Sequence, residues 1–246
     1  MTAPDTIESP PPAPTEAPGA LDDLIEIFVA PATVFARRAN ASAWLPILIA
    51  TIVITGLAIV GKDAMAPIFD AEFSRGIAAA QKQNPQLTAE NFEGMRKFGT
   101  FTSTYGLVAF LPLSALLVGL WVWIVAKLFS APITYGQGIL IAGWSMMPRI
   151  LGTVIDLAQL MLIDAATITG RFSLSLGVGR FLDPDTQQVL MAVLGRVDLI
   201  TLWVTAIIAV GIVTVGKLDR SKVWLIGAVS WIGGMLFPLF GALRAG

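Results

Sequence analysis

The amino-acid sequence predicts an all-α, polytopic membrane protein, a bundle of five transmembrane helices with an N-terminal amphipathic segment and two partly helical extramembrane loops. Hydrophobic residues make up 55% of the 246 positions and charged residues only 13%, whereas soluble domains carry roughly 25% charged residues. Several uncharged stretches also approach the length of about 20 apolar residues that a helix needs to cross the hydrocarbon of a bilayer.

The chain divides into three parts before any motif is considered. Residues 1–20 are rich in proline, alanine and acidic side chains, which predicts a disordered tail. Residues 21–40 form an amphipathic segment, with Leu21 and Ile25 on one helical side and Asp22 and Asp23 on the other, and Pro31 begins a second short helix. We expect this segment either to lie on the membrane surface or to pack against the ends of the spans. Residues 41–246 form the membrane domain.

Five hydrophobic segments are expected to span the bilayer, at residues 44–60, 105–127, 135–163, 197–215 and 223–243. The third should begin at Thr134, because Thr134 and Gln137 have the spacing of a capping box. Between the spans, the polar residues 61–100 predict two helices broken at Asn84 and Pro85. Residues 165–182 alternate weakly between glycines, which predicts a short hairpin, and a helix should follow and stop at Gly195.

Two charges in the third expected span are the sharpest feature of the sequence. Arg149 and Asp156 lie seven residues apart, so they share one helical face. A charged residue at the bilayer centre costs roughly 2.5–3.5 kcal/mol on insertion scales, so both should face the bundle interior. Asp198, at the start of the fourth span, is a further candidate partner. The group predicts either a polar site for a substrate, lipid headgroup or ion, or a buried ion pair that fixes the register of two spans.

The composition limits the chemistry that the chain can perform. It contains neither cysteine nor histidine, which removes thiol nucleophiles, imidazole acid–base catalysis and the usual transition-metal ligands. Asp156 has no second carboxylate at its depth, so paired-carboxylate catalysis is not expected. The net charge of −1 gives no reason to expect nucleic acid. We therefore expect a protein without enzymatic activity, metal or cofactor, whose partners are the lipid bilayer and other membrane proteins; its oligomeric state stays open.

Three segments resemble bacterial members of the Yip family, named for Ypt-interacting protein. The first contains Pro31 and Phe35; the second, residues 141–151, carries Pro148 in mid-span; the third, residues 197–203, ends at Trp203 and is followed by Gly211 and a basic loop at 217–222. The resemblance covers residues 25–240. It implies five spans, a cytosolic N-terminal segment and a multi-pass protein of the bacterial cytoplasmic membrane.

The expected function follows from the resemblance and from the lack of catalytic residues. We expect an adaptor or accessory subunit for other membrane proteins, in membrane trafficking, transport or envelope processes. The alternative is a small transporter or channel that uses the Arg149 and Asp156 site. Three basic residues in the six-residue loop 217–222 favour a cytoplasmic position for this loop, and with it for the N-terminus.

Overall fold

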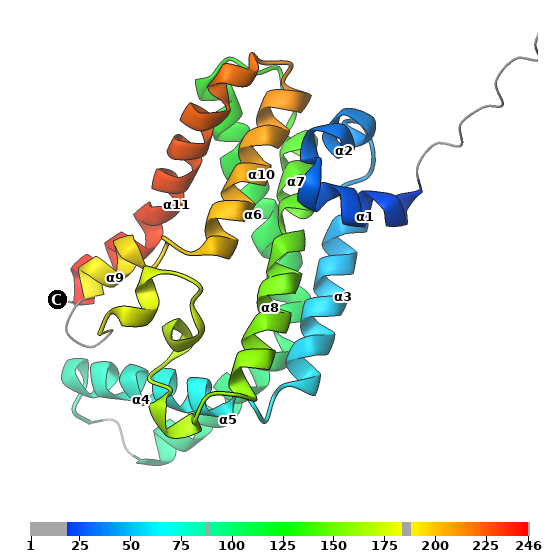
Figure 1. The fold of residues 1–246 in the computed structure, drawn as a ribbon. Helices are drawn as coiled ribbons and strands as arrows, with labels where there is room; N and C mark the ends of the chain where they lie inside the picture. The colour runs from blue at the N-terminus through cyan, green and yellow to red at the C-terminus, as the bar shows by residue number, and fades with distance from the viewer. Residues whose placement is uncertain (1–18, 87–88, 184–187, 246) are drawn as a thin grey trace, which may run out of the picture.

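The computed structural model describes residues 19–86, 89–183 and 188–245, so the expected disordered tail falls outside the described residues up to position 18. All regular structure in the described ranges is helical (Figure 1). The α-helices are α1 Ala20–Val29, α2 Pro31–Arg38, α3 Trp44–Val60, α4 Ala66–Gln83, α5 Ala89–Tyr105, α6 Leu107–Leu128, α7 Tyr135–Ser145, α8 Met147–Leu160, α9 Gln188–Leu194, α10 Leu199–Val215 and α11 Val223–Ala245. Short 3-10 turns η1 to η4 cover Ala165–Thr167, Arg171–Leu174, Val178–Phe181 and Arg220–Lys222.

Helix α7 forms the centre of the bundle. It packs against α6, α10 and α3, and Ile141 and Trp144 on it are almost completely buried. Its start is the predicted capping box: Thr134 Oγ1 accepts from the Gln137 N–H at 3.2 Å, and Gln137 Oε1 accepts from the Thr134 N–H at 3.0 Å. This local signal therefore fixes the first residue of the helix that the other spans surround.

Three helical stretches are long and apolar enough to cross a membrane. They are Leu107–Leu128 with 22 residues, Tyr135–Leu160 with 26 residues, and Arg220–Ala242 with 23 residues. Two shorter apolar helices, Trp44–Val60 and Leu199–Val215, have 17 residues each. At a rise of 1.5 Å per residue, the shorter pair measures about 26 Å, close to the minimum for a span. All five stretches coincide with segments expected to span the bilayer.

The expected third span, residues 135–163, is divided into two helices. Helix α7 ends at Ser145, α8 begins at Met147 with Pro148 in its first turn, and the helix stops at Leu160. Pro148 has no N–H to donate to the carbonyl of Trp144, and its ring crowds that carbonyl, so the helical hydrogen bonds are interrupted here.

The hairpin predicted for residues 165–182 is wrong. Among the described residues, this segment forms the 3-10 turns η1, η2 and η3, and its one isolated bridge joins Gly177 to Asp198 rather than two arms of a hairpin. Asp164 caps η1 through the N–H of Ala166. Side-chain caps and contacts to the start of α10 thus replace strand pairing, because both satisfy the backbone groups of a short glycine-rich segment.

An extramembrane helical hairpin, α4 with α5, lies at one end of the bundle (Figure 1). Helix α4 ends at Gln83 and Asn84 follows it, close to the predicted break. The connections between α6 and α7 and between α10 and α11 lie at the opposite end (Figure 1). The two ends of the bundle thus differ: one carries short turns, and the other carries the hairpin and the η1–η3 segment.

Candidate functional site

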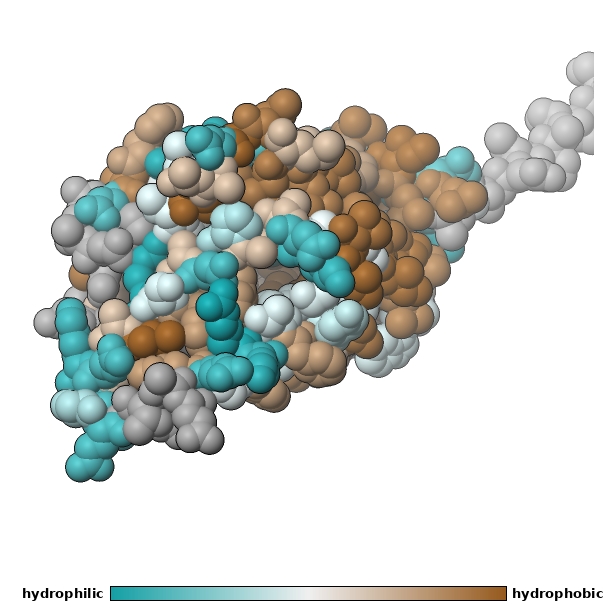
Figure 2. Space-filling view, turned by 90° about the horizontal axis from the view of Figure 1, so that it is seen from below, coloured by the Kyte–Doolittle hydropathy of each residue, from teal (hydrophilic) through white to brown (hydrophobic). Residues whose placement is uncertain are grey.

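A polar cavity of about 460 Å³ lies between α3, α6, α8, the start of α10 and the η2 turn. Its charged lining consists of Arg149 and Asp156 from α8, Arg171 from η2, and Asp198 from the cap of α10. The backbone N–H of Arg171 donates to Glu72 of α4, so this side of the cavity faces the hairpin. Seen from the hairpin end, the molecule is hollowed near its centre, and hydrophilic side chains border the hollow (Figure 2).

Asp198 connects two segments of the chain through hydrogen bonds to both of its carboxylate oxygens. Oδ1 accepts from the N–H groups of Ile200 and Thr201 at 3.0 and 3.2 Å, which caps α10. Oδ2 accepts from the hydroxyl of Ser175 and the N–H of Leu176 at 3.0 and 2.9 Å. One carboxylate therefore holds the η2–η3 segment against the start of α10, and its acceptor capacity of about four hydrogen bonds is filled.

Arg149 has no partner of this kind. Within the described parts of the chain, its guanidinium makes no hydrogen bond or ion pair; the one bond at this residue runs from the Thr153 hydroxyl to the Arg149 carbonyl, at 2.9 Å. Asp156 makes no ion pair there either. The structure thus brings Arg149, Asp156 and Asp198 around one cavity, but without a direct ion pair among them.

Two further arginines belong to this region, although sequence analysis did not single them out. Arg171 is exposed at the cavity lining, and its guanidinium lies 4.8 Å from the centre of the Phe172 ring. Arg196 is partly buried, with its Nε lacking a partner, and it packs against Gly234 of α11, where a Cβ atom would come within 2.5 Å of the guanidinium. Its place two residues before the capping Asp198 is the signal that could have identified it.

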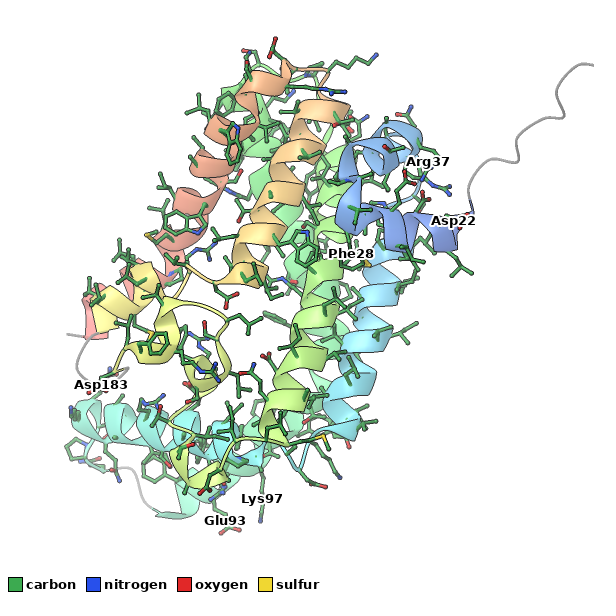
Figure 3. The ribbon with its side chains drawn as sticks, in the orientation of Figure 1. Asp22, Phe28, Arg37, Glu93, Lys97 and Asp183 are labelled. Atoms are coloured by element: carbon green, nitrogen blue, oxygen red, sulfur yellow. The ribbon has the colours of Figure 1, made fainter. Side chains whose placement is uncertain are left out.

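The three segments that resemble the Yip family meet at one junction of helices. Phe35 of α2 is fully buried, and a Cβ at Gly211 of α10 would lie 3.0 Å from its ring and 2.7 Å from Ile141 of α7. Phe28 of α1 contacts Trp203 of α10 edge-to-face, with ring centres 5.5 Å apart; Figure 3 labels Phe28 beside the bundle. Phe35 and Trp203 therefore dock the N-terminal helices onto the spans, whereas Pro31 begins α2 and Pro148 marks the break between α7 and α8.

The N-terminal helices are joined by a buried acidic residue. Asp23 is completely buried and forms ion pairs with Arg37 and with Arg38, and Arg37 also pairs with Glu26 at 2.6 Å. Hydrogen bonds to Glu26 and to Asp23 raise the pKa of the Arg37 guanidinium above its ordinary value. These two acidic partners therefore stabilise the charged form of the Arg37 guanidinium.

The acidic side of α1 is divided between solvent and the protein interior, since Asp22 is exposed and Asp23 is buried. Asp23 points inward with Ile27, while an apolar stripe remains exposed, with Leu21 at 77%, Ile25 at 74% and Val29 at 82%. Helix α1 packs on α2 and α8, in agreement with the alternative that this segment packs against the spans. Its outward stripe is apolar, which is the property that the membrane-surface alternative requires.

The fold and the cavity define a class: an all-α, polytopic membrane protein with polar groups gathered inside its bundle. Among the described residues, no group of three acidic side chains could hold a metal ion. The chain belongs to the Yip1 domain family, since the Yip1 domain matches residues 25–242. This is a family of non-enzymatic membrane proteins. No curated protein matches the chain, and no solved structure does.

Proposed function

We propose that the protein is a non-enzymatic adaptor or accessory subunit for other membrane proteins, held by five spans in a bacterial cytoplasmic membrane with its N-terminus in the cytoplasm. One observation carries the adaptor role: the α4–α5 hairpin is ordered outside the bundle while its own chain covers little of it. A helix in water gains most of its stability from burying an apolar face. Helix α4 has 18 residues and none of them is buried.

Helix α5 adds an apolar stripe to this hairpin. Met95, Phe98 and Phe101 recur every three residues and are all exposed, Phe98 at 69% and Phe101 at 59%. Exposed aromatic patches with a charged border are typical of protein contact surfaces. Glu93 and Lys97 supply such charges on the same helix, at the outer end of the molecule (Figure 3).

The hairpin is also fixed in shape, as a docking surface should be. Arg96 of α5 forms an ion pair with Asp70 of α4, and the ring of Phe69 lies against Gly99, where a Cβ would come within 3.2 Å. The N–H of Arg171 on Glu72 ties α4 to the η2 turn. A preorganised surface loses little conformational entropy on binding, which supports a contact role.

Site-specific photo-crosslinking in membranes tests the adaptor role. A photoreactive phenylalanine analogue at Phe98 should give discrete protein adducts that mass spectrometry can identify. The matched control is the same analogue at Phe110, which is equally exposed but lies on the lipid-facing side of α6, and which should give lipid adducts. Adducts to lipid alone at Phe98 would overturn the proposal.

A transporter or channel is the second candidate, and the polar cavity is the observation that favours it. Arg149 is exposed on the cavity wall and has no partner among the described residues, as a substrate-contacting arginine would be. In proteoliposomes, Arg149→Ala should abolish a flux while leaving the yield of folded protein nearly unchanged. If Arg149→Ala instead unfolds the protein and a second change, Asp156→Ala, restores it, the two residues serve stability and the transporter is rejected.

A further inference from the structure

The side chain of Arg149 is exposed on the wall of the cavity, and its guanidinium has no acceptor among the described residues. We propose that the cavity between α8, α10 and η2 binds an oxyanion, the phosphate or carboxylate of a ligand, against the guanidinium of Arg149. This binding site goes beyond the adaptor role and requires no transport.

The first argument is the state of the carboxylates. A guanidinium carries five N–H donors, and carboxylate or phosphate oxygens are its usual acceptors. Asp198 is the carboxylate expected to supply them, but its two oxygens are already occupied by Ile200, Thr201, Ser175 and Leu176. The donors of Arg149 therefore face the cavity without an acceptor among the described side chains.

The second argument is the balance of charge. Arg171 lines the same cavity, and Arg196 lies close enough to Arg149 for the two positive charges to interact unfavourably. Arg149 and Arg171 thus share the cavity wall with two carboxylates, Asp156 and Asp198, and Arg196 adds a third positive charge nearby. An anionic group at Arg149 would relieve this repulsion, whereas a cationic ligand would increase it.

The third argument is size and access. A volume of about 460 Å³ lies within the range of roughly 300–1,000 Å³ typical of small-molecule sites. Thr201 and Gly152 line its interior, and the exposed Arg171 marks an end that reaches the surface. Two sources can supply the same chemistry: a phospholipid headgroup from the bilayer, or a free oxyanion that enters past Arg171.

Native mass spectrometry of the full-length protein in detergent tests the site and separates the two sources. The probes are phosphatidylglycerol, diacylglycerol with the same acyl chains, and inorganic phosphate. If the ligand is a lipid, phosphatidylglycerol remains bound, diacylglycerol does not, and inorganic phosphate does not displace the lipid. If the ligand is a free oxyanion, inorganic phosphate binds and displaces any retained phosphatidylglycerol.

Variants then assign the binding to Arg149. Arg149→Gln should weaken it about tenfold or more, since hydrogen bonds to a charged group are lost, and Arg149→Lys should retain part of it. Arg96→Gln is the matched control: it removes an arginine from the hairpin, outside the cavity, and should bind like the wild type. The Phe98 crosslink should survive Arg149→Gln, so failure of this site and failure of the adaptor role are distinguishable.

Two outcomes overturn the proposal. One is equal retention of diacylglycerol and phosphatidylglycerol by the wild type with no effect of phosphate, a result that needs no variant. The other is unchanged binding in Arg149→Gln. If Arg149→Gln does not fold, Thr201→Leu fills the cavity from a different helix; reduced binding then supports the site, and binding equal to wild type rejects it.

Discussion

Asp198 connects the start of α10 to a neighbouring loop through its carboxylate, although the sequence suggested it as an ion-pair partner for Arg149. Its carboxylate accepts two N–H groups at the start of α10 and two donors from the segment around Ser175. A capping carboxylate also benefits from the positive end of the helix dipole. The charge is thus stabilised without Arg149. This is why a cavity with a free guanidinium persists beside a carboxylate that the sequence places at the right depth.

Asp156 provides the first prediction. It lines the cavity two helical turns from Arg149, about 10 Å along the axis, so its negative charge should repel a bound oxyanion. Asp156→Asn removes that charge while keeping the shape, and it should tighten oxyanion binding about fourfold to sixteenfold for an effective dielectric constant between about 20 and 40. Titration of the purified variant with the ligand found by mass spectrometry measures the change.

The control for this prediction is Glu93→Gln, which removes an exposed carboxylate from the hairpin and should leave the affinity unchanged. Weaker binding in Asp156→Asn would contradict the repulsion and would show that Asp156 itself holds a positively charged part of the ligand.

For single residues, the spacing in the sequence predicted which side chains share a face, but the sequence did not predict their hydrogen-bond partners. Seven residues on a helix place Arg149 and Asp156 on one face, and both line the cavity. The sequence could not show that Ser175 and Leu176 would occupy Asp198, because these residues lie 23 and 22 positions away in a loop. Arg171 was missed for the same reason: its place depends on the path of that loop.

The element scale is represented by the α1–α2 unit, which a buried ion-pair network holds together. Asp23→Ala leaves Arg37 and Arg38 without their shared partner inside a packed junction. Removing one member of a buried pair costs about 3–5 kcal/mol, and since both arginines are partly exposed we expect about 2 kcal/mol here. Hydrogen exchange of the α1 amides should therefore become faster, while exchange in α6 stays unchanged.

Asp22→Ala is the matched control, because Asp22 lies next to Asp23 but is exposed and only accepts from the Gly19 N–H, at 2.8 Å. Its α1 amides should exchange at nearly the wild-type rate. Equal acceleration in both variants would mean that the acidic character of α1, and not the buried pair, holds the helix in place.

Close packing between α2, α7 and α10 gives a second prediction at this scale. A Cβ at Gly211 would lie 2.7 Å from Ile141 Cγ2 and 3.0 Å from the Phe35 ring, nearer than atoms tolerate. Gly211→Ala should lower the free energy of unfolding by about 1–3 kcal/mol, because the added methyl group overpacks this junction. Gly56→Ala is the control: nothing lies within 4 Å of a Cβ there, so it should be neutral or stabilising. Stability equal to wild type in Gly211→Ala would show that α2 is not tightly docked.

The elements themselves were predictable where local chemistry decides them. The capping box at Thr134 and Pro31 at the start of α2 each fixed a helix start. Periodicity gave the two sides of α1 but not which side is buried, because that choice depends on Arg37 and Arg38 of the next helix. The β-hairpin predicted for residues 165–182 was wrong, because the weak alternation of this segment competes with capping by Asp164 and Asp198.

For the whole molecule, the unequal helix lengths raise the question of how many helices cross the bilayer. Three stretches are long enough by length and composition, and Trp44–Val60 and Leu199–Val215 have only 17 residues. A short apolar helix can still span a membrane when the bilayer thins or flanking side chains reach the interface. The composition predicted a membrane protein, because the chain has too few charged residues to cover a soluble surface. It does not determine the number of crossings.

The absence of cysteine from the chain makes the topology testable with single substitutions. Ser42→Cys lies before α3, Ser74→Cys lies in α4, and Ser221→Cys lies between α10 and α11, all at exposed positions. With five spans and a cytoplasmic N-terminus, a membrane-impermeant maleimide should label Ser74→Cys in intact cells, and the other two variants only after permeabilisation. The number of spans and the orientation then separate: labelling of Ser42→Cys and Ser221→Cys but not of Ser74→Cys keeps the spans and inverts the protein. Different labelling of Ser42→Cys and Ser221→Cys is incompatible with four crossings between them, and it would mean that one of the 17-residue helices does not cross the bilayer.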